Sequence, residues 1–428
     1  MKISLSNIGK IKKADIEIGG IAVIAGENDT GKSTIAKSLY SIINTFYNID
    51  KKIELDKREI LQEISERVFI DILNSIKPKA RVLTRIKSYE LYEEFKTVKN
   101  INIDNLKNII KNKILDCDIE LSDDVDKIID KNLKRVNQVL SITDKEMQDR
   151  IVDRQFKSEF YGEINNIYSD KHGEIRLDLK GKIIEINVNN NNINMGKIEP
   201  IIVVNAIYID SSLIMDEFKK SFFLYRKNFN DSNHRDNLKA ILYERDNNIS
   251  RSVMIEGQFK NIYNMISRVV LGNFEFDNRG NGIYRNADGI TLRMENISAG
   301  LKTFIIIKTL FLNGSIKDNG ILILDEPEIH LHPKLQLVFA ELIVLLQKEF
   351  NLHILLSTHS PYFLKAIEVY SKKHEISSKC RYYLTKSLDD KKKNIEVEDV
   401  TDKTYEIYKL LAEPYNMLNE IEDSIDEF

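Results

Sequence analysis

Two groups of residues, far apart in the chain, have the types and spacing that phosphate chemistry needs. The first runs from Gly26 to Ser33 and matches the pattern G-x-x-x-x-G-K-[ST] through Gly31, Lys32 and Ser33. Glycines let several backbone N–H groups point at one phosphate, and a helix that starts there adds partial positive charge. Lys32 can reach the β and γ phosphates of a nucleotide, and the Ser33 hydroxyl can bind Mg²⁺.

The residues around this loop supply the elements that must position it. The apolar run Ile21–Ala25 predicts a buried parallel strand before the loop, and an apolar stripe containing Ile35, Leu39 and Ile42 predicts a helix after it. This setting favours a site for ATP and Mg²⁺ over an ordinary strand-to-helix turn. The candidate nucleotide-binding residues of the loop are Gly26, Glu27, Asn28, Asp29, Thr30, Gly31, Lys32, Ser33 and Thr34.

The second group follows another apolar run, Ile321–Leu324, which predicts a second buried strand that ends in Asp325 and Glu326. A carboxylate at such a strand end can hold Mg²⁺ beside a phosphate loop, which suits Asp325. Glu326 can act as the general base for an attacking water. Alone, the pair could be an acidic turn after a strand, but its combination with the phosphate loop favours the catalytic interpretation.

Two weaker signals flank the carboxylates. Ser298 and Gly300 open an apolar helix, where Ser298 suits the N-cap and Gly300 permits close approach of a ligand. His359 follows the apolar strand His353–Leu356, where it could contact a γ-phosphate. Taken alone, Ser298 and Gly300 would be interpreted as a capped helix start and His359 as a structural histidine. Their order in the chain relative to the phosphate loop and Asp325 is what makes them informative.

The order of phosphate loop, serine-glycine helix start, Asp-Glu-Pro and strand-Thr-His resembles ABC-type ATPase heads. The stretches Asp325–Pro333 and Leu356–Pro361 are similar to the branch that holds OLD-family nucleases, RecF and SMC proteins, over about residues 1–48 and 173–385. The resemblance implies an α/β P-loop NTPase fold with a mixed sheet and an antiparallel β-lobe. It implies that Lys32 binds the β and γ phosphates, that Ser33 and Asp325 hold Mg²⁺, and that Glu326 is the base. It also implies that Ser298 and Gly300 contact the γ-phosphate held by a second head, and that His359 is a switch histidine.

Three features depart from that pattern or leave it open. Leu301 stands where the signature usually has glutamine, and neither Gln62 nor Gln155 has the context of a glutamine loop. His330 and His332 could form a metal pair, but their spacing fits the family's dimer-contact loop better.

The distribution of glycine and of helical apolar patterns along the chain predicts its domain organisation. The segment from 49 to 172 has glycine only at Gly162 and repeats helical apolar stripes, so we expect a helical insertion within an ATPase head formed by 1–48 and 173–400. Five basic residues between Lys77 and Lys87 form either a solvated face or a contact for phosphate or a partner. Residues 401–428 predict a short, acidic helical tail, too short for the nuclease domain that follows the ATPase in OLD-family enzymes.

Composition narrows the class of protein. The chain has 428 residues, 42 % of them hydrophobic and 30 % charged, and a net charge of −3. These values predict a globular protein and do not indicate direct nucleic-acid binding, although a local basic face would be compatible with them. Two cysteines, no signal-peptide pattern and no membrane-length apolar run lead us to expect a cytoplasmic protein without membrane contact.

Two functional hypotheses follow. In the first, ATP-dependent pairing of heads into a homo-oligomer regulates a separately encoded effector, a nuclease or toxin from a neighbouring gene, as the resemblance to ATPase subunits of the anti-phage systems Septu and PARIS implies. In the second, the chain is a RecF-like or SMC-like ATPase that grips DNA in repair. A transport ATPase ranks third, because transport subunits have shorter insertions and keep the signature glutamine.

Overall fold

The computed structural model describes residues 1–75, 103–115, 123–198, 202, 204–218, 233–244 and 257–426. The chain divides into two compact units, one formed by Met1–Tyr47 with Val152–Phe428 and the other by Asn48–Ile151. The second unit begins one residue before the expected insertion of 49–172, at Asn48, and ends earlier, at Ile151, because the residues from Val152 on pack with the first unit. The basic cluster between Lys77 and Lys87 lies outside the described residues.

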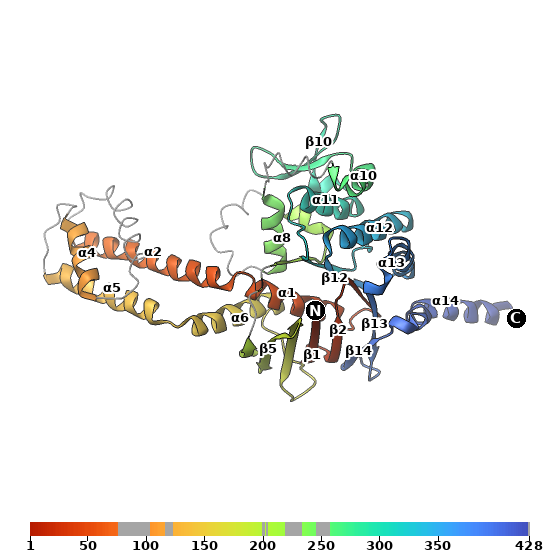
Figure 1. Ribbon diagram of the computed structural model, residues 1–428, viewed down its shortest axis with the longest axis horizontal. Coiled ribbons are helices and arrows are strands. Elements are labelled where there is room, and N and C mark those ends of the chain that lie inside the picture. Colours follow the sequence, from red (N-terminus) through yellow and green to blue (C-terminus); the bar gives the residue numbers. More distant parts are fainter. Residues whose placement is uncertain are drawn as a thin grey trace. The chain divides into compact units, whose positions relative to one another are not determined.

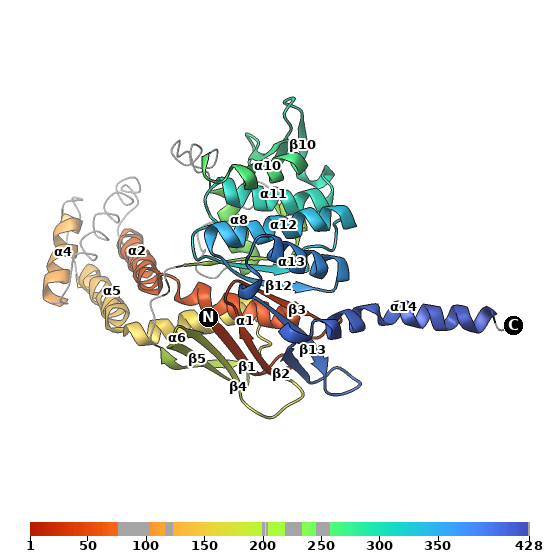
Figure 2. The same ribbon diagram turned by 45° about the vertical axis from the view of Figure 1, so that its right-hand side comes forward.

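The first unit is built on one mixed sheet with the strand order β6-β5-β4-β1-β2-β14-β13-β3-β12-β11-β7 (Figures 1 and 2). Neighbours from β13 to β7 pair in parallel, whereas those from β6 to β2 pair antiparallel. The strands are β1 (Lys2–Ile8), β2 (Ile11–Glu17), β3 (Ile21–Ala25), β4 (Gly173–Leu179), β5 (Lys182–Asn189), β6 (Asn192–Ile198), β7 (Ala206–Ile209), β11 (Ile321–Asp325), β12 (His353–Thr358), β13 (Cys380–Ser387) and β14 (Ile395–Asp399). A separate antiparallel sheet contains β8 (Asn273–Phe276), β9 (Gly282–Arg285) and β10 (Thr291–Arg293).

Helices cover the parallel part of the sheet on both faces, which explains why its strands are continuous apolar runs. Alternate residues of β3, such as Ile21 and Val23, share one core with α11, α12 and α13, whereas α1 contacts β7, β11 and β12. The helices are α1 (Lys32–Phe46), α6 (Asp144–Phe160), α8 (His234–Tyr243), α10 (Lys260–Val269), α11 (Ala299–Leu312), α12 (Pro333–Phe350), α13 (Pro361–Lys373) and α14 (Tyr405–Asp426), with 3₁₀ turns η1 (Ser212–Glu217), η3 (Met294–Asn296), η4 (Ser377–Lys379) and η5 (Thr401–Lys403).

Local sequence fixes where the helices after β11 and β12 begin. Proline occupies the first helical position of both α12 and α13, where its missing N–H costs nothing. The His332 ring accepts the N–H of Lys334, and the Ser360 hydroxyl accepts the N–H of Phe363. Helix α12 thus begins at Pro333, after the loop that follows Asp325, and α13 begins at Pro361, shortly after the end of β12 at Thr358.

The second unit has its own hydrophobic core between α2 (Ile49–Ser75), α4 (Ile103–Leu115) and α5 (Asp123–Ser141). The expected apolar stripe of α5 faces this core, because Val125, Ile129, Leu133 and Val136 are all buried against α2 and α4. Lys107 pairs with Asp130 and Lys111 with Asp126, both at 2.6 Å, along the exposed side of the contact between α4 and α5. No helix in the described part of the chain is long and apolar enough to cross a membrane.

Candidate functional site

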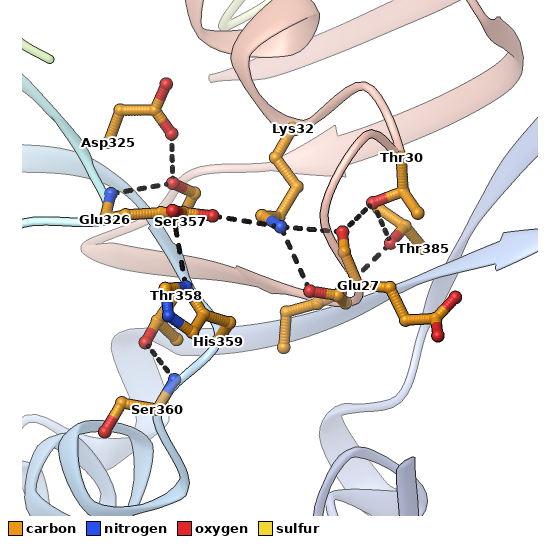
Figure 3. A network of polar contacts seen from close by, with 12 residues as sticks. Glu27, Thr30, Lys32, Asp325, Glu326, Ser357, Thr358, His359, Ser360 and Thr385 are labelled. Carbon is orange, nitrogen blue, oxygen red and sulfur yellow. Dashed lines mark hydrogen bonds and ion pairs between the residues drawn. The ribbon is translucent and has the colours of Figure 1, made fainter. Parts of the chain in front are cut away.

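The phosphate loop lies between β3 and α1 and has the backbone that its glycines predict. Gly26 (φ +153°) and Gly31 (φ +79°) both adopt conformations that favour glycine. A Cβ on Gly26 would lie 1.8 Å from the Thr385 hydroxyl oxygen, and one on Gly31 would lie 2.6 Å from Ile11. The Thr30 hydroxyl donates to the Glu27 carbonyl at 2.7 Å and accepts from Thr385 at 2.8 Å (Figure 3). Thr385 of β13 thus stabilises the phosphate loop through its hydrogen bond to Thr30.

Lys32 is the centre of the site, and its buried ammonium group lies between the loop and the end of β11 (Figure 3). It donates hydrogen bonds to the carbonyls of Gly26 at 3.0 Å and Glu27 at 2.8 Å, and it lies 3.1 Å from Glu326 Oε1. On the other carboxylate oxygen, His359 Nδ1 lies 3.3 Å from Glu326 Oε2. The structure therefore joins three residues that the sequence placed in one site, although they come from three different strand ends.

Glu326 has φ +47°, a conformation that residues other than glycine seldom adopt. Its backbone N–H donates to the Ser357 carbonyl at 3.2 Å and to the Ser357 hydroxyl at 3.0 Å. These bonds to β12 hold the strained turn in place, and the turn directs the carboxylate toward Lys32.

Asp325 accepts a hydrogen bond on each carboxylate oxygen, which fixes the orientation of the group. The Ser357 hydroxyl donates to Oδ1, and the Tyr208 hydroxyl donates to Oδ2 at 3.1 Å. Burial raises the pKa of Tyr208 well above its ordinary value, as do the charges of Asp325 and Asp210, so the phenol remains a donor. Asp325 and the exposed Ser33 carry hard oxygen donors, the type that Mg²⁺ prefers, so both fit a magnesium site.

Glu328 is a site residue that sequence reasoning missed. It is 2 % exposed, and its Oε1 accepts hydrogen bonds from the Thr358 hydroxyl and from the His359 N–H. Burial raises the pKa of Glu328 above its ordinary value, although these hydrogen bonds oppose the shift. Its function here is to hold the segment that carries His359. The sequence signal that could have identified it is the second glutamate of Asp-Glu-Pro-Glu.

Ser298 and Gly300 lie at the start of α11, apart from this cluster. Ser298 occupies the N-cap position but makes no capping hydrogen bond through its side chain, which is exposed. A Cβ on Gly300 would lie 2.7 Å from the carbonyl oxygen of His330, so this glycine allows α11 to pack on the loop after Glu326. Among the described residues, no hydrogen bond or ion pair joins Ser298 or Gly300 to the phosphate loop of the same chain.

The segment after β7 also reaches the site and was not predicted to do so. A cavity of about 80 Å³ is lined by Asp210, Ser211 and Ser212 on one side and by Asp325 and Glu326 on the other. The glutamines considered from the sequence are elsewhere, Gln62 on α2 and Gln155 on α6. Because β7 is a parallel edge strand beside β11, its carboxyl end opens at the same edge as Asp325.

The fold and the site together define an α/β P-loop nucleotide-binding protein with a mixed sheet and a small antiparallel sheet. The sequence matches the AAA ATPase domain family over residues 1–364, and the chain belongs to that family. The predicted fold class is thereby confirmed, and the family match agrees with the resemblance to ATPases.

The solved structures that this chain matches include SMC head domains. The head from Thermotoga maritima matches with 11 % identity and a TM-score of 0.39 over 93 % of this chain and 98 % of that one. An SMC head bound to the C-terminal winged-helix domain of ScpA matches with 11 % identity and a TM-score of 0.43 over 93 % and 97 %. An SMC head with an extended coiled coil, bound to the C-terminal domain of ScpA from Pyrococcus furiosus, matches with 11 % identity and a TM-score of 0.39 over 98 % of both chains. No curated protein matches the sequence.

Proposed function

We propose that this chain binds ATP and Mg²⁺ at the phosphate loop and hydrolyses ATP with Glu326 as the general base. The observation that carries the proposal is the position of Glu326, 3.1 Å from Lys32 and 3.3 Å from His359. Lys32 binds the terminal phosphates, and a water on the far side of the γ-phosphate gives its proton to Glu326. His359 keeps that carboxylate in place and contacts the γ-phosphate.

Ser33 and Asp325 are the residues that would hold Mg²⁺. The ion would neutralise charge on the β and γ phosphates during transfer. The hydroxyl groups of Ser357 and Tyr208 leave the Asp325 carboxylate only a small range of orientations, which favours binding of a metal with strict geometry.

The exposed start of α11 supports the proposal that two copies complete each site. The Ser298 hydroxyl is not used as a cap, and the close packing of Gly300 places this helix start next to the loop that follows Glu326. In the proposed dimer, Ser298 and Gly300 of one copy bind the γ-phosphate held by the phosphate loop of the other, so ATP itself joins the two heads.

The biological role that we propose is control of a separately encoded effector, a nuclease or toxin, in anti-phage defence. The support for this role is the sequence resemblance to stand-alone ATPase subunits of such systems. The protein should then purify in a stoichiometric complex with the product of a neighbouring gene. Tight, ATP-dependent binding of duplex DNA by this chain alone, with no stable partner, would contradict the role and favour the DNA-repair alternative.

The catalytic part of the proposal is tested with Glu326→Gln. This change removes the base but keeps the shape of the side chain, so ATP turnover should fall by about 10²-fold or more while ATP binding remains. Glu349→Gln is a matched control, because Glu349 is exposed on α12. Turnover of the Glu326→Gln variant at the rate of the control would show that Glu326 is not the base.

A further inference from the structure

A buried chain of hydrogen bonds, ion pairs and one ring contact leads from Asp325 to Glu159 within the first unit. Tyr208, which is 2 % exposed, donates its hydroxyl to Asp325 Oδ2 and lies with its ring stacked on His234, at a centroid distance of 4.1 Å. His234 is 6 % exposed and is therefore also removed from solvent.

Two carboxylates fix the position of the His234 ring. Its Nδ1 lies 2.6 Å from Glu159 Oε1, and its Nε2 lies 3.1 Å from Asp210 Oδ2. Glu159, which is 1 % exposed, also accepts the backbone N–H of His234 at 3.0 Å through its other oxygen. Arg235 donates to Asp210 at 2.8 Å and so holds that carboxylate in turn.

We propose that Tyr208 is a positioning residue for Asp325, and that Glu159 and Asp210 act on Asp325 through His234 and Tyr208. The inference rests on the proposed function, because it takes Asp325 to be the Mg²⁺ ligand. A hydrogen bond to a ligating carboxylate orients it, and loss of such a partner commonly weakens metal binding.

Glu159 lies on α6, a helix that runs along the chain from the second unit into the first. Helix α6 begins at Asp144, within the second unit, and ends at Phe160, within the first. It is thus one of the two covalent links between the units, the other being Tyr47–Asn48, and it carries Glu159 at its end in the first unit.

The experiment measures binding of a non-hydrolysable ATP analogue to the full chain, in Mn²⁺ and in EDTA. The dissociation constant in EDTA divided by the dissociation constant in Mn²⁺ gives the factor by which the metal tightens nucleotide binding. In Tyr208→Phe this ratio should fall by about tenfold, with the dissociation constant in EDTA unchanged, because the only group lost is the Tyr208 hydroxyl that donates to Asp325. Tyr40→Phe is the matched control, since its ring lies 6.0 Å from that of Tyr208 in the same cluster. An unchanged ratio in Tyr208→Phe would overturn the positioning role.

Asp325→Asn separates the two proposals. If it lowers the ratio and Tyr208→Phe does not, the inference fails and the proposed metal site stands. If Asp325→Asn leaves the ratio unchanged, the proposed metal ligand itself is wrong.

A double-mutant cycle tests the part of the chain beyond Tyr208. Glu159→Gln should lower the ratio by about threefold in the native background and have no effect in the Tyr208→Phe background, because coupled residues are not additive. Additive effects, or no effect in the native background, would overturn the role of Glu159. If Glu159→Gln does not fold, Asp210→Asn is measured in both backgrounds: an effect through His234 and Tyr208 should disappear in the Tyr208→Phe background, whereas a direct effect of Asp210 on the cavity would persist and overturn this link.

Discussion

At the scale of single residues, the site depends on side chains that hold one another in place. Lys32 is held by two loop carbonyls and by Glu326, Glu326 is flanked by His359, and Asp325 is held by two hydroxyls. In such a preorganised arrangement, small changes close to the phosphates should have large effects.

Gly26→Ala tests the requirement for close approach in the phosphate loop. The added methyl group would lie 1.8 Å from the Thr385 hydroxyl oxygen at a backbone conformation that alanine seldom adopts, so the loop must move. We expect ATP affinity to fall by at least about tenfold, measured by equilibrium binding. Gly257→Ala is the control, because a Cβ at Gly257 meets open space. Equal ATP affinity in the two variants would refute the packing argument.

The buried His234 predicts a dependence of stability on pH. Burial by itself lowers the pKa of His234, but the contacts with Asp210 and Glu159 outweigh it, and the pKa lies above its ordinary value of about 6.5. Protonated His234 therefore stabilises the folded protein fully below pH ~6.5, and this contribution is lost as pH rises through the folded-state pKa.

Urea unfolding of the native protein and of His234→Gln between about pH 6 and 9 measures this contribution. The difference in unfolding free energy between the two proteins should decrease as pH rises. A difference that is constant or increases with pH would show that His234 is not held in its charged form.

At the scale of elements, α14 combines a packed start with an exposed continuation. Ile407 is fully buried, and Tyr408 donates to Glu368 of α13 at 2.9 Å, whereas residues 412–422 are exposed. Removing the chain after Leu411 should change the thermal midpoint by less than about 2 °C, because the side chains of residues 412–422 are exposed. Removing it before Ile407 should lower the midpoint clearly, as seen by circular dichroism. A large fall in the thermal midpoint after removal of the chain beyond Leu411 would contradict the assignment of residues 412–422 as an exposed continuation of α14.

The sequence was sufficient to predict the elements that carry the motifs. Strands β3 and β11 are predictable because they are all-apolar runs that end at a polar turn, and the helix start at Ser298 because an apolar stripe follows it. The chain of contacts from Asp325 to Glu159 could not be predicted, because it joins α6, β7, α8 and β11 through tertiary packing alone. Nothing in the local pattern around Glu159 or His234 distinguishes them from surface residues.

At the scale of the whole molecule, the proposed unit of function is a pair of heads. Each chain would contribute a phosphate loop to one nucleotide and the start of α11 to the other. A closed, two-fold symmetric dimer would therefore contain two equivalent sites, each formed by the phosphate loop of one copy and the start of α11 of the other. This arrangement is the central claim of the proposed function. In it, bound ATP would join the two copies, and the effector would respond to whether the two heads are joined or apart.

The most direct test of this claim is ATP turnover by a mixture of two variants that are inactive alone. Lys32→Ala removes the phosphate-loop cation, and Ser298→Arg blocks the exposed helix start without disturbing a capping hydrogen bond. Mixed in equal amounts, they should recover about one quarter of native turnover, because half of the dimers are mixed and each contains one intact site out of two. A mixture no more active than the separate variants, with mixed dimers demonstrably present, would contradict a site shared between two copies.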